Sequence, residues 1–225
     1  MNDNERLRYL LTYEVALQCR QALTAIHLAP AVHRDFPLYP AHGAVEDQNE
    51  WRRQRRILDE HVLMYVHAFL THAANISKIL WPPRPKNRRG APHPYTKEQR
   101  EERAMVMRGD LGVPDDSALR LREVRDDLEH LDERIERWFQ GRPGPHLDLR
   151  DLDTLPFGLS SLDAGVTAIR EFDMGKIRIF DGTYQLNPLI FAVEALRPTT
   201  EQWLVDHEHW LHASVLLSPT SLPQR

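Results

Sequence analysis

The sequence predicts a mainly α-helical fold, a helical bundle with two long antiparallel helices, followed by a carboxyl-terminal extension that holds a small β-hairpin. Two observations support this fold class. Apolar residues recur at intervals of three and four through two long stretches near the amino terminus, which is the spacing of a buried helix face. Later in the chain, Asp181-Gly182 lies between alternating apolar residues, the pattern of a two-residue hairpin turn. We place the helical domain at residues 1–144 and the extension at residues 145–225.

The two long helices are predicted at residues 3–28 and from about Asp47 to Leu80. The apolar positions of the first helix are Leu7, Leu10, Leu11, Leu17, Leu23 and Ile26. Pro30 stops this pattern, and a loop rich in Pro and Gly follows. The apolar positions of the second helix are Leu58, Val62, Tyr65, Phe69, Ala73, Ile76 and Leu80. Two prolines after Leu80 end the second helix. His72 lies near its apolar seam and is predicted to be a partly buried, hydrogen-bonded histidine.

Composition and cysteine usage argue against several classes of protein. The formal net charge of −4 is unlike that of a dedicated duplex-DNA-binding protein, which is usually basic. No apolar run approaches the ~20 residues that span a bilayer, and the amino terminus lacks the layout of a signal peptide, so no membrane association is expected. Cys19 is the only cysteine, so a disulfide within the chain is impossible and a reduced, cytoplasmic setting is expected. Because Cys19 lies in an apolar stretch, it is predicted to be a small core residue.

The basic region of the chain is residues 82–103, where Pro and Gly predict an extended loop. Its clustered cations are Arg84, Lys86, Arg88 and Arg89. Two interpretations remain open. One is a flexible, soluble connector between helices. The other is an RNA-binding loop, because clustered Lys and Arg attract a polyanion without reading its sequence.

A third helix is predicted from about Ser117 to Phe139, where charged residues are dense. Its apolar seam consists of Leu121, Val124, Leu128, Leu131, Ile135 and Trp138. At ~100° per residue, Arg125 lies about 90° and His130 about 130° from the centre of that seam, so both are predicted outside the buried face. The simpler interpretation of the charges is a surface helix held together by ion pairs between residues four positions apart.

The extension is predicted to hold several short elements. They are a helix at residues 160–172, the hairpin at 176–186, a helix from Asn187 to Leu196 and a last helix through 201–212. Thr199 and Gln202 have the spacing of a capping box for the last helix. Asp206, His209 and His212 would be a conceivable three-ligand metal cluster. A packed amphipathic helix end is the favoured interpretation, so no metal site and no cofactor are expected.

Residues 125–130, Arg-Asp-Asp-Leu-Glu-His, resemble the Arg–polar–X3–His signature of the HEPN superfamily, the higher eukaryote and prokaryote nucleotide-binding domains. Two long helices followed by a motif-bearing helix are similar to the plan of these bundles over roughly residues 1–140. If the site is active, the resemblance implies a metal-independent ribonuclease, including the toxin of a toxin–antitoxin pair. His130 would then transfer protons, Arg125 would stabilise the phosphorane charge, and Asp126 would hold the imidazole tautomer.

Two departures from the signature favour an alternative function. Asp126 stands where Asn is the commonest residue, and Asp132 stands where toxin members often have Tyr. An added carboxylate repels a phosphate, so the alternative is a catalytically inactive HEPN-like module that binds a nucleotide, an RNA or a protein partner.

The geometry of the motif bears on the oligomeric state. On one straight helix Arg125 and His130 diverge by about 140°, so one chain does not bring both onto one phosphate. Two copies around a twofold axis could each supply one residue, and active HEPN nucleases are similar in using paired domains. The geometry therefore favours a second copy of the chain as a partner, and the resemblance implies an RNA substrate and an antitoxin-like protein as further partners.

Overall fold

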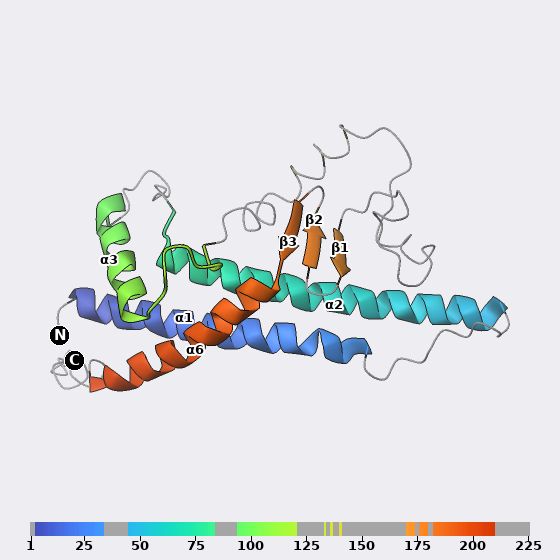
Figure 1. Cartoon of the computed structure of the whole chain (residues 1–225), viewed down its shortest axis with the longest axis horizontal. Helices are drawn as coiled ribbons and strands as arrows, with labels where there is room; N and C mark the ends of the chain where they lie inside the picture. The colour runs from blue at the N-terminus through green and yellow to red at the C-terminus, as the bar shows by residue number, and fades with distance from the viewer. Residues whose placement is uncertain are drawn as a thin grey trace, which may run out of the picture. The chain divides into compact units, whose positions relative to one another are not determined.

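The computed structural model describes residues 3–33, 45–83, 94–120, 170–173, 176–179 and 182–209, together with residues 133, 136 and 140. Its elements in chain order are α1 (Asp3–Leu28), the 3-10 helix η1 (Pro30–His33), α2 (Val45–Leu80), α3 (Lys97–Asp110), β1 (Arg170–Asp173), β2 (Lys176–Ile179), β3 (Gly182–Gln185) and α6 (Asn187–Asp206) (Figure 1). The fold is mainly α-helical with one small antiparallel sheet, which confirms the predicted fold class.

The chain divides into two compact units. The first is formed by Met1–Gln21, His72–Arg120 and Ala192–Arg225, and the second by Ala22–Thr71 and Leu121–Phe191. The first unit holds most of α1, the end of α2, all of α3 and most of α6. The sheet lies in the second unit. The domain boundary at residue 144 stays a prediction.

α1 and α2 have nearly the bounds that their apolar periodicity predicts. Their parts in the first unit run in opposite directions (Figure 1). Of the predicted α2 seam, the buried residues are Val62, Phe69, Ala73, Ile76 and Leu80. On α1, Leu10 was expected in the core but is 50 % exposed. The buried positions of α1 instead include several small residues, Ala16, Cys19, Ala22 and Ala25. Small side chains permit a short distance between packed helices, which periodicity alone does not reveal.

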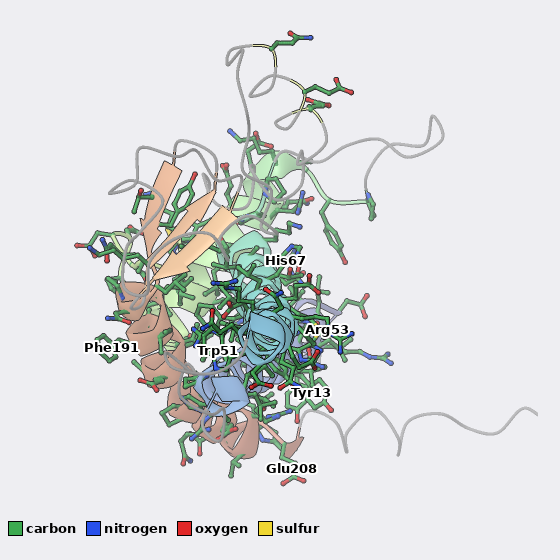
Figure 2. All side chains as sticks on the ribbon, turned by 90° about the vertical axis from the view of Figure 1, so that its right-hand side faces the viewer. Tyr13, Trp51, Arg53, His67, Phe191 and Glu208 are labelled. Atoms are coloured by element: carbon green, nitrogen blue, oxygen red, sulfur yellow. The ribbon has the colours of Figure 1, made fainter. Side chains whose placement is uncertain are left out.

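The outer side of α2 is charged and paired along the helix. Arg53 donates to both carboxylate oxygens of Glu50 at 3.0 Å, and Arg55 donates to Asp59 at 3.2 Å. Arg53 and His67 project from α2 into solvent (Figure 2). Ion pairs one turn apart contribute only ~0.2–0.5 kcal/mol each. This arginine-rich turn of α2 is therefore a solvated helix face.

α3 corrects the prediction of an extended loop over residues 82–103, because the chain is helical from Lys97. A capping box begins the helix: the Gln99 backbone N–H donates to Thr96 Oγ1 at 3.3 Å, and the Thr96 N–H donates to Gln99 Oε1 at 2.9 Å. Ala104 and Met107 are buried on one face. Gly112, with a φ of 64°, follows the helix in the left-handed conformation that commonly closes a helix. Residues from Lys97 onward are favourable for a helix, but the many charged residues among them led to the prediction of a loop.

The start of the third predicted helix is wrong in the described part. Residues 117–120 form a turn, in which the Arg120 N–H donates to the Ser117 carbonyl oxygen at 2.9 Å. The Ser117 hydroxyl accepts from the Leu119 N–H, a local bond that competes with helix formation. Glu133, Glu136 and Gln140 are helical and exposed. The rest of this predicted helix lies outside the described residues.

The sheet has three strands in the order β1-β2-β3, all antiparallel. β2 and β3 confirm the predicted hairpin, but Ile179 pairs with Gly182, so the connection lies one residue earlier than Asp181-Gly182. The end of the helix predicted at residues 160–172 is wrong, because β1 begins at Arg170. Its register sets Glu171 opposite Arg178 and Phe172 opposite Ile177. A hairpin alone is marginal in water, so the third strand supports it.

α6 replaces the two helices predicted around residues 187–212. It runs from Asn187 to Asp206 through Pro198, and Thr199 does not cap it. The Thr199 hydroxyl donates instead to the Ala195 carbonyl oxygen at 3.3 Å. Proline inside a helix costs ~3 kcal/mol. Burial of one continuous face, which includes Val193, Leu196 and Trp203, offsets that cost.

A junction in the first unit joins α1, α3 and α6. Arg8 on α1 forms an ion pair with Asp110 at the end of α3, and its guanidinium lies 6.0 Å from the Trp203 ring centre on α6. The Tyr9 and Trp203 ring centres are 6.3 Å apart. Arg20 and Glu201 add a 3.6 Å ion pair between α1 and α6. These contacts hold both α3 and α6 against α1.

Candidate functional site

The residues predicted to carry function lie outside the described residues. These are the catalytic candidates Arg125, Asp126 and His130 and the RNA-binding candidates Arg84, Lys86, Arg88 and Arg89. The structure describes the residues at both ends of the segment 84–93, and three exposed helical residues that follow His130 in the chain. It also describes a polar cluster between α1 and α2. These are the parts of the molecule on which the functional predictions can be tested.

Two arginines of α3 contact the ends of the segment 84–93. Arg100 Nη1 donates to the carbonyl oxygen of Pro83 at 2.9 Å, which is the residue before the segment. The Arg103 guanidinium carbon lies 4.9 Å from the ring centre of Tyr95, which follows the segment closely. Both arginines are partly buried. The capping box at Thr96 thus begins a helix that brings two cations to the ends of the segment 84–93.

The charges of these two arginines are not balanced by a carboxylate within the described part of the chain. Arg108, one helix turn further on, differs: it pairs with Asp115 at 3.0 Å and donates to the Leu80 carbonyl oxygen at 2.6 Å. Burial lowers the pKa of the Arg103 guanidinium, and the positive charge of Arg100 acts in the same direction. Arg100 and Arg103 are therefore adjacent, partly desolvated cations.

Sequence reasoning missed this arginine pair because it assigned residues 97–103 to a loop. A usable signal was present: Thr96 and Gln99 have capping-box spacing, and no Pro or Gly interrupts residues 97–108. The helical period then sets Arg100 and Arg103 on one side and the three glutamates of α3 on another.

A hydrogen-bonded cluster lies between α1 and α2 in the first unit. Gln18 Oε1 accepts from His72 Nδ1–H at 2.7 Å and from Asn75 Nδ2–H at 3.3 Å. Gln18 Nε2–H donates to Glu14 Oε1 at 2.6 Å. An amide oxygen only accepts, so the proton of His72 is on Nδ1 and Nε2 is the remaining acceptor. This confirms the prediction of a partly buried, hydrogen-bonded histidine at position 72.

This cluster has the parts of an acid–base relay but lacks a reacting partner among the described residues. Burial lowers the pKa of His72, against the opposing charge of Glu14. His72 is therefore neutral near pH 7. The hydrogen bonds of Gln18 join two packed helices, and buried polar contacts of this kind select one register of a helix pair. The cluster is explained by helix pairing.

Other candidate sites are weak in the described residues. Cys19 is buried, and burial together with Glu201 raises the pKa of its thiol to about 12, so it is an inert core residue as predicted. No group of three metal-ligating side chains occurs among the described residues, and His212 lies outside them. None of the described helices is long and apolar enough to cross a membrane.

No protein-family model, curated protein or solved structure matches this chain. The likeness to the HEPN superfamily therefore depends on the motif at residues 125–130 and on the order of the helices.

Proposed function

We propose that this chain is a HEPN-like helical protein that acts on RNA, with Arg125 and His130 at its site. The observation that carries the proposal is the exposure of Glu133, Glu136 and Gln140, the helical residues that follow the motif. On the predicted helix these three positions lie about 110° to 170° from the centre of the apolar seam. Their exposure supports the predicted division of that helix into a buried side and an open side.

The same helical register relates the motif to these exposed positions. Arg125 and Glu136 are eleven residues apart, so they lie within about 20° of each other around a straight helix. His130 lies about 60° from Glu133 by the same count. A motif in these directions would be open to a large substrate such as RNA. A catalytic pair on the buried side of the helix would not be open to such a substrate.

Ribonuclease chemistry is the first form of the proposal. Cleavage begins when a base removes the proton of a ribose 2′-hydroxyl, whose oxygen then attacks the adjacent phosphorus. An acid protonates the leaving 5′-oxygen, and a cation stabilises the phosphorane. His130 suits the proton steps because imidazole titrates near neutral pH. Arg125 suits the phosphorane, because its planar guanidinium forms paired hydrogen bonds with phosphate oxygens.

The second form is an inactive module of the same fold that binds RNA, a nucleotide or a protein. Asp126 and Asp132 favour it, because both add negative charge beside a phosphate site. An antitoxin-like protein that covers the motif is a proposed partner of the ribonuclease form. A cytoplasmic setting is proposed for both the ribonuclease and the inactive module, because the chain has a single cysteine.

In the ribonuclease form of the proposal, the protein is a symmetric homodimer. The divergence of Arg125 and His130 around one helix means that one chain supplies only one of them to a given phosphate. A second copy, related by a twofold axis, would supply the other. Light scattering at tens of micromolar checks this, and a monomer mass there would contradict a shared active site.

The central experiment compares wild type with Arg125→Ala, His130→Ala and the matched control Arg134→Ala. Arg134→Ala removes the same charge from the same segment but lies outside the motif. Each protein is incubated with a structured RNA, with and without EDTA, and its melting curve is recorded. We expect each motif variant to lose cleavage without a change in melting, and the double variant to lose no more than either alone, because the residues act as a unit.

Each outcome separates the two forms. Cleavage lost only in the motif variants supports the ribonuclease. Binding of the RNA without cleavage by wild type supports the inactive module, and fluorescence anisotropy measures it. Equal cleavage by all proteins indicates a contaminant and ends the catalytic form. A wild type that neither cleaves nor binds RNA contradicts the proposal as a whole.

A further inference from the structure

The arginine pair of α3 has an arrangement that suits an anion. Arg100 and Arg103 are three residues apart on one helix, which sets their side chains next to each other on its surface. At three and four positions before and after these two arginines, the sequence holds no Asp or Glu. The glutamates of α3, Glu98, Glu101 and Glu102, face other directions, and Glu101 pairs with Lys97 at 3.5 Å.

Each guanidinium is held in a way that leaves donors for a ligand. Arg100 uses Nη1 for the Pro83 carbonyl oxygen, and its other N–H groups remain. The guanidinium carbon of Arg103 lies over the ring of Tyr95, 4.9 Å from its centre. A stacked, oriented guanidinium loses less conformational freedom when it binds than a free side chain does. The pair is thus preorganised as well as charged.

We infer that Arg100 and Arg103 together bind a phosphate group in the backbone of an RNA. The inference rests on the proposed function and specifies how RNA would be held away from Arg125 and His130. Arginine forms paired, charge-assisted hydrogen bonds with phosphate oxygens, and two adjacent guanidiniums can share the two nonbridging oxygens of one backbone phosphate. The four cations at residues 84–89 lie, along the sequence, between the two ends that this pair contacts.

The first test measures RNA affinity by fluorescence anisotropy across a range of salt concentrations. The probe is a short labelled single-stranded RNA with 2′-O-methyl groups, which cannot be cleaved. The variants are Arg100→Gln, Arg103→Gln and both together, and the matched control is Lys97→Gln. Lys97 belongs to the same helix, but Glu101 already balances its charge. We expect each arginine variant to weaken binding roughly tenfold and Lys97→Gln to bind as wild type does.

The salt dependence identifies the contact as ionic. Loss of the contact with one phosphate of a single strand should flatten the plot of log affinity against log salt by about 0.7. Arg103→Lys keeps the charge but not the planar fork, so it should keep most of the slope and still lose affinity. Because Arg100→Gln also removes the bond to Pro83, melting curves accompany every variant. Arg103→Lys keeps the test valid if Arg100→Gln fails to fold.

A second measurement detects the contact directly in the wild type. Nuclear magnetic resonance of the arginine Nε–H groups, assigned with the variants, should show Arg103 and Arg100 shifting as the RNA is added. Equal shifts with inorganic phosphate at the same concentration would overturn an RNA-backbone site. Equal competition by poly-glutamate would overturn it in favour of an acidic protein.

The outcomes distinguish this inference from the proposed function. If wild type binds RNA and the arginine variants bind as Lys97→Gln does, the arginine pair is not the contact, while the proposed function stands. If wild type does not bind RNA at all, both fail. Selective loss in the arginine variants, with the flatter salt plot, supports the pair.

Discussion

Gln18 is the residue on which the pairing of α1 and α2 in the first unit can be tested most sharply. It is 8 % exposed. Its amide accepts hydrogen bonds from His72 and Asn75 on α2 and donates one to Glu14 on α1. We expect Gln18→Ala to lower the free energy of unfolding by about 2–4 kcal/mol.

The magnitude follows from the bonds that are lost. Three hydrogen bonds contribute a net ~1 kcal/mol each, and the cavity left by the shorter side chain adds to the loss. His72 and Asn75 are only partly buried, so water can satisfy some of their freed donors, which limits the total. A loss of this size is a large share of the ~5–15 kcal/mol that stabilises a typical domain.

Urea denaturation followed by circular dichroism measures the change. Gln21→Ala is the matched control, because it makes the same substitution at an exposed position of α1 and should lie within ~0.5 kcal/mol of wild type. A double-mutant cycle of Gln18→Ala with His72→Ala should give a coupling energy of about 1 kcal/mol. If Gln18→Ala were as stable as Gln21→Ala, or the cycle were additive, the bonds would not stabilise the helix pair.

Two further predictions concern titrating groups in the first unit. Burial lowers the pKa of His72, so as the pH falls the unfolded chain binds the proton before the folded protein does. The free energy of unfolding should therefore be at its full value above pH ~6.5 and decrease as the pH falls toward the folded pKa. His72→Gln should lose that decrease in urea titrations at several pH values, and an unchanged decrease would contradict the assignment. The thiol of Cys19, whose pKa burial raises to about 12, should react with a thiol reagent only after denaturation, and rapid labelling of the native protein would show that it is accessible.

Elements whose signals are local and repeated could be predicted from the sequence. The apolar seam of α2 spans many turns, so a few misassigned positions such as Tyr65 did not change its bounds. The hairpin followed from alternation around a turn dipeptide, although the register moved by one residue. His72 and Cys19 were correctly placed as core or seam residues from their position in those patterns. The motif at Arg125 and His130 also comes from spacing alone, and it stays a prediction because it lies outside the described residues.

Elements that depend on distant partners could not be predicted from local signals. α6 continues through Pro198 because a face that includes Val193 and Trp203 is buried on both sides of the proline, and local propensity contains no term for that burial. β1 is a strand because β2 pairs with it. The hydrogen bond from Arg100 to Pro83 spans the segment 84–93, and the bond from His72 to Gln18 joins residues 54 positions apart. Periodicity predicts which side of a helix is apolar, but which polar groups meet across two helices depends on how those helices pack.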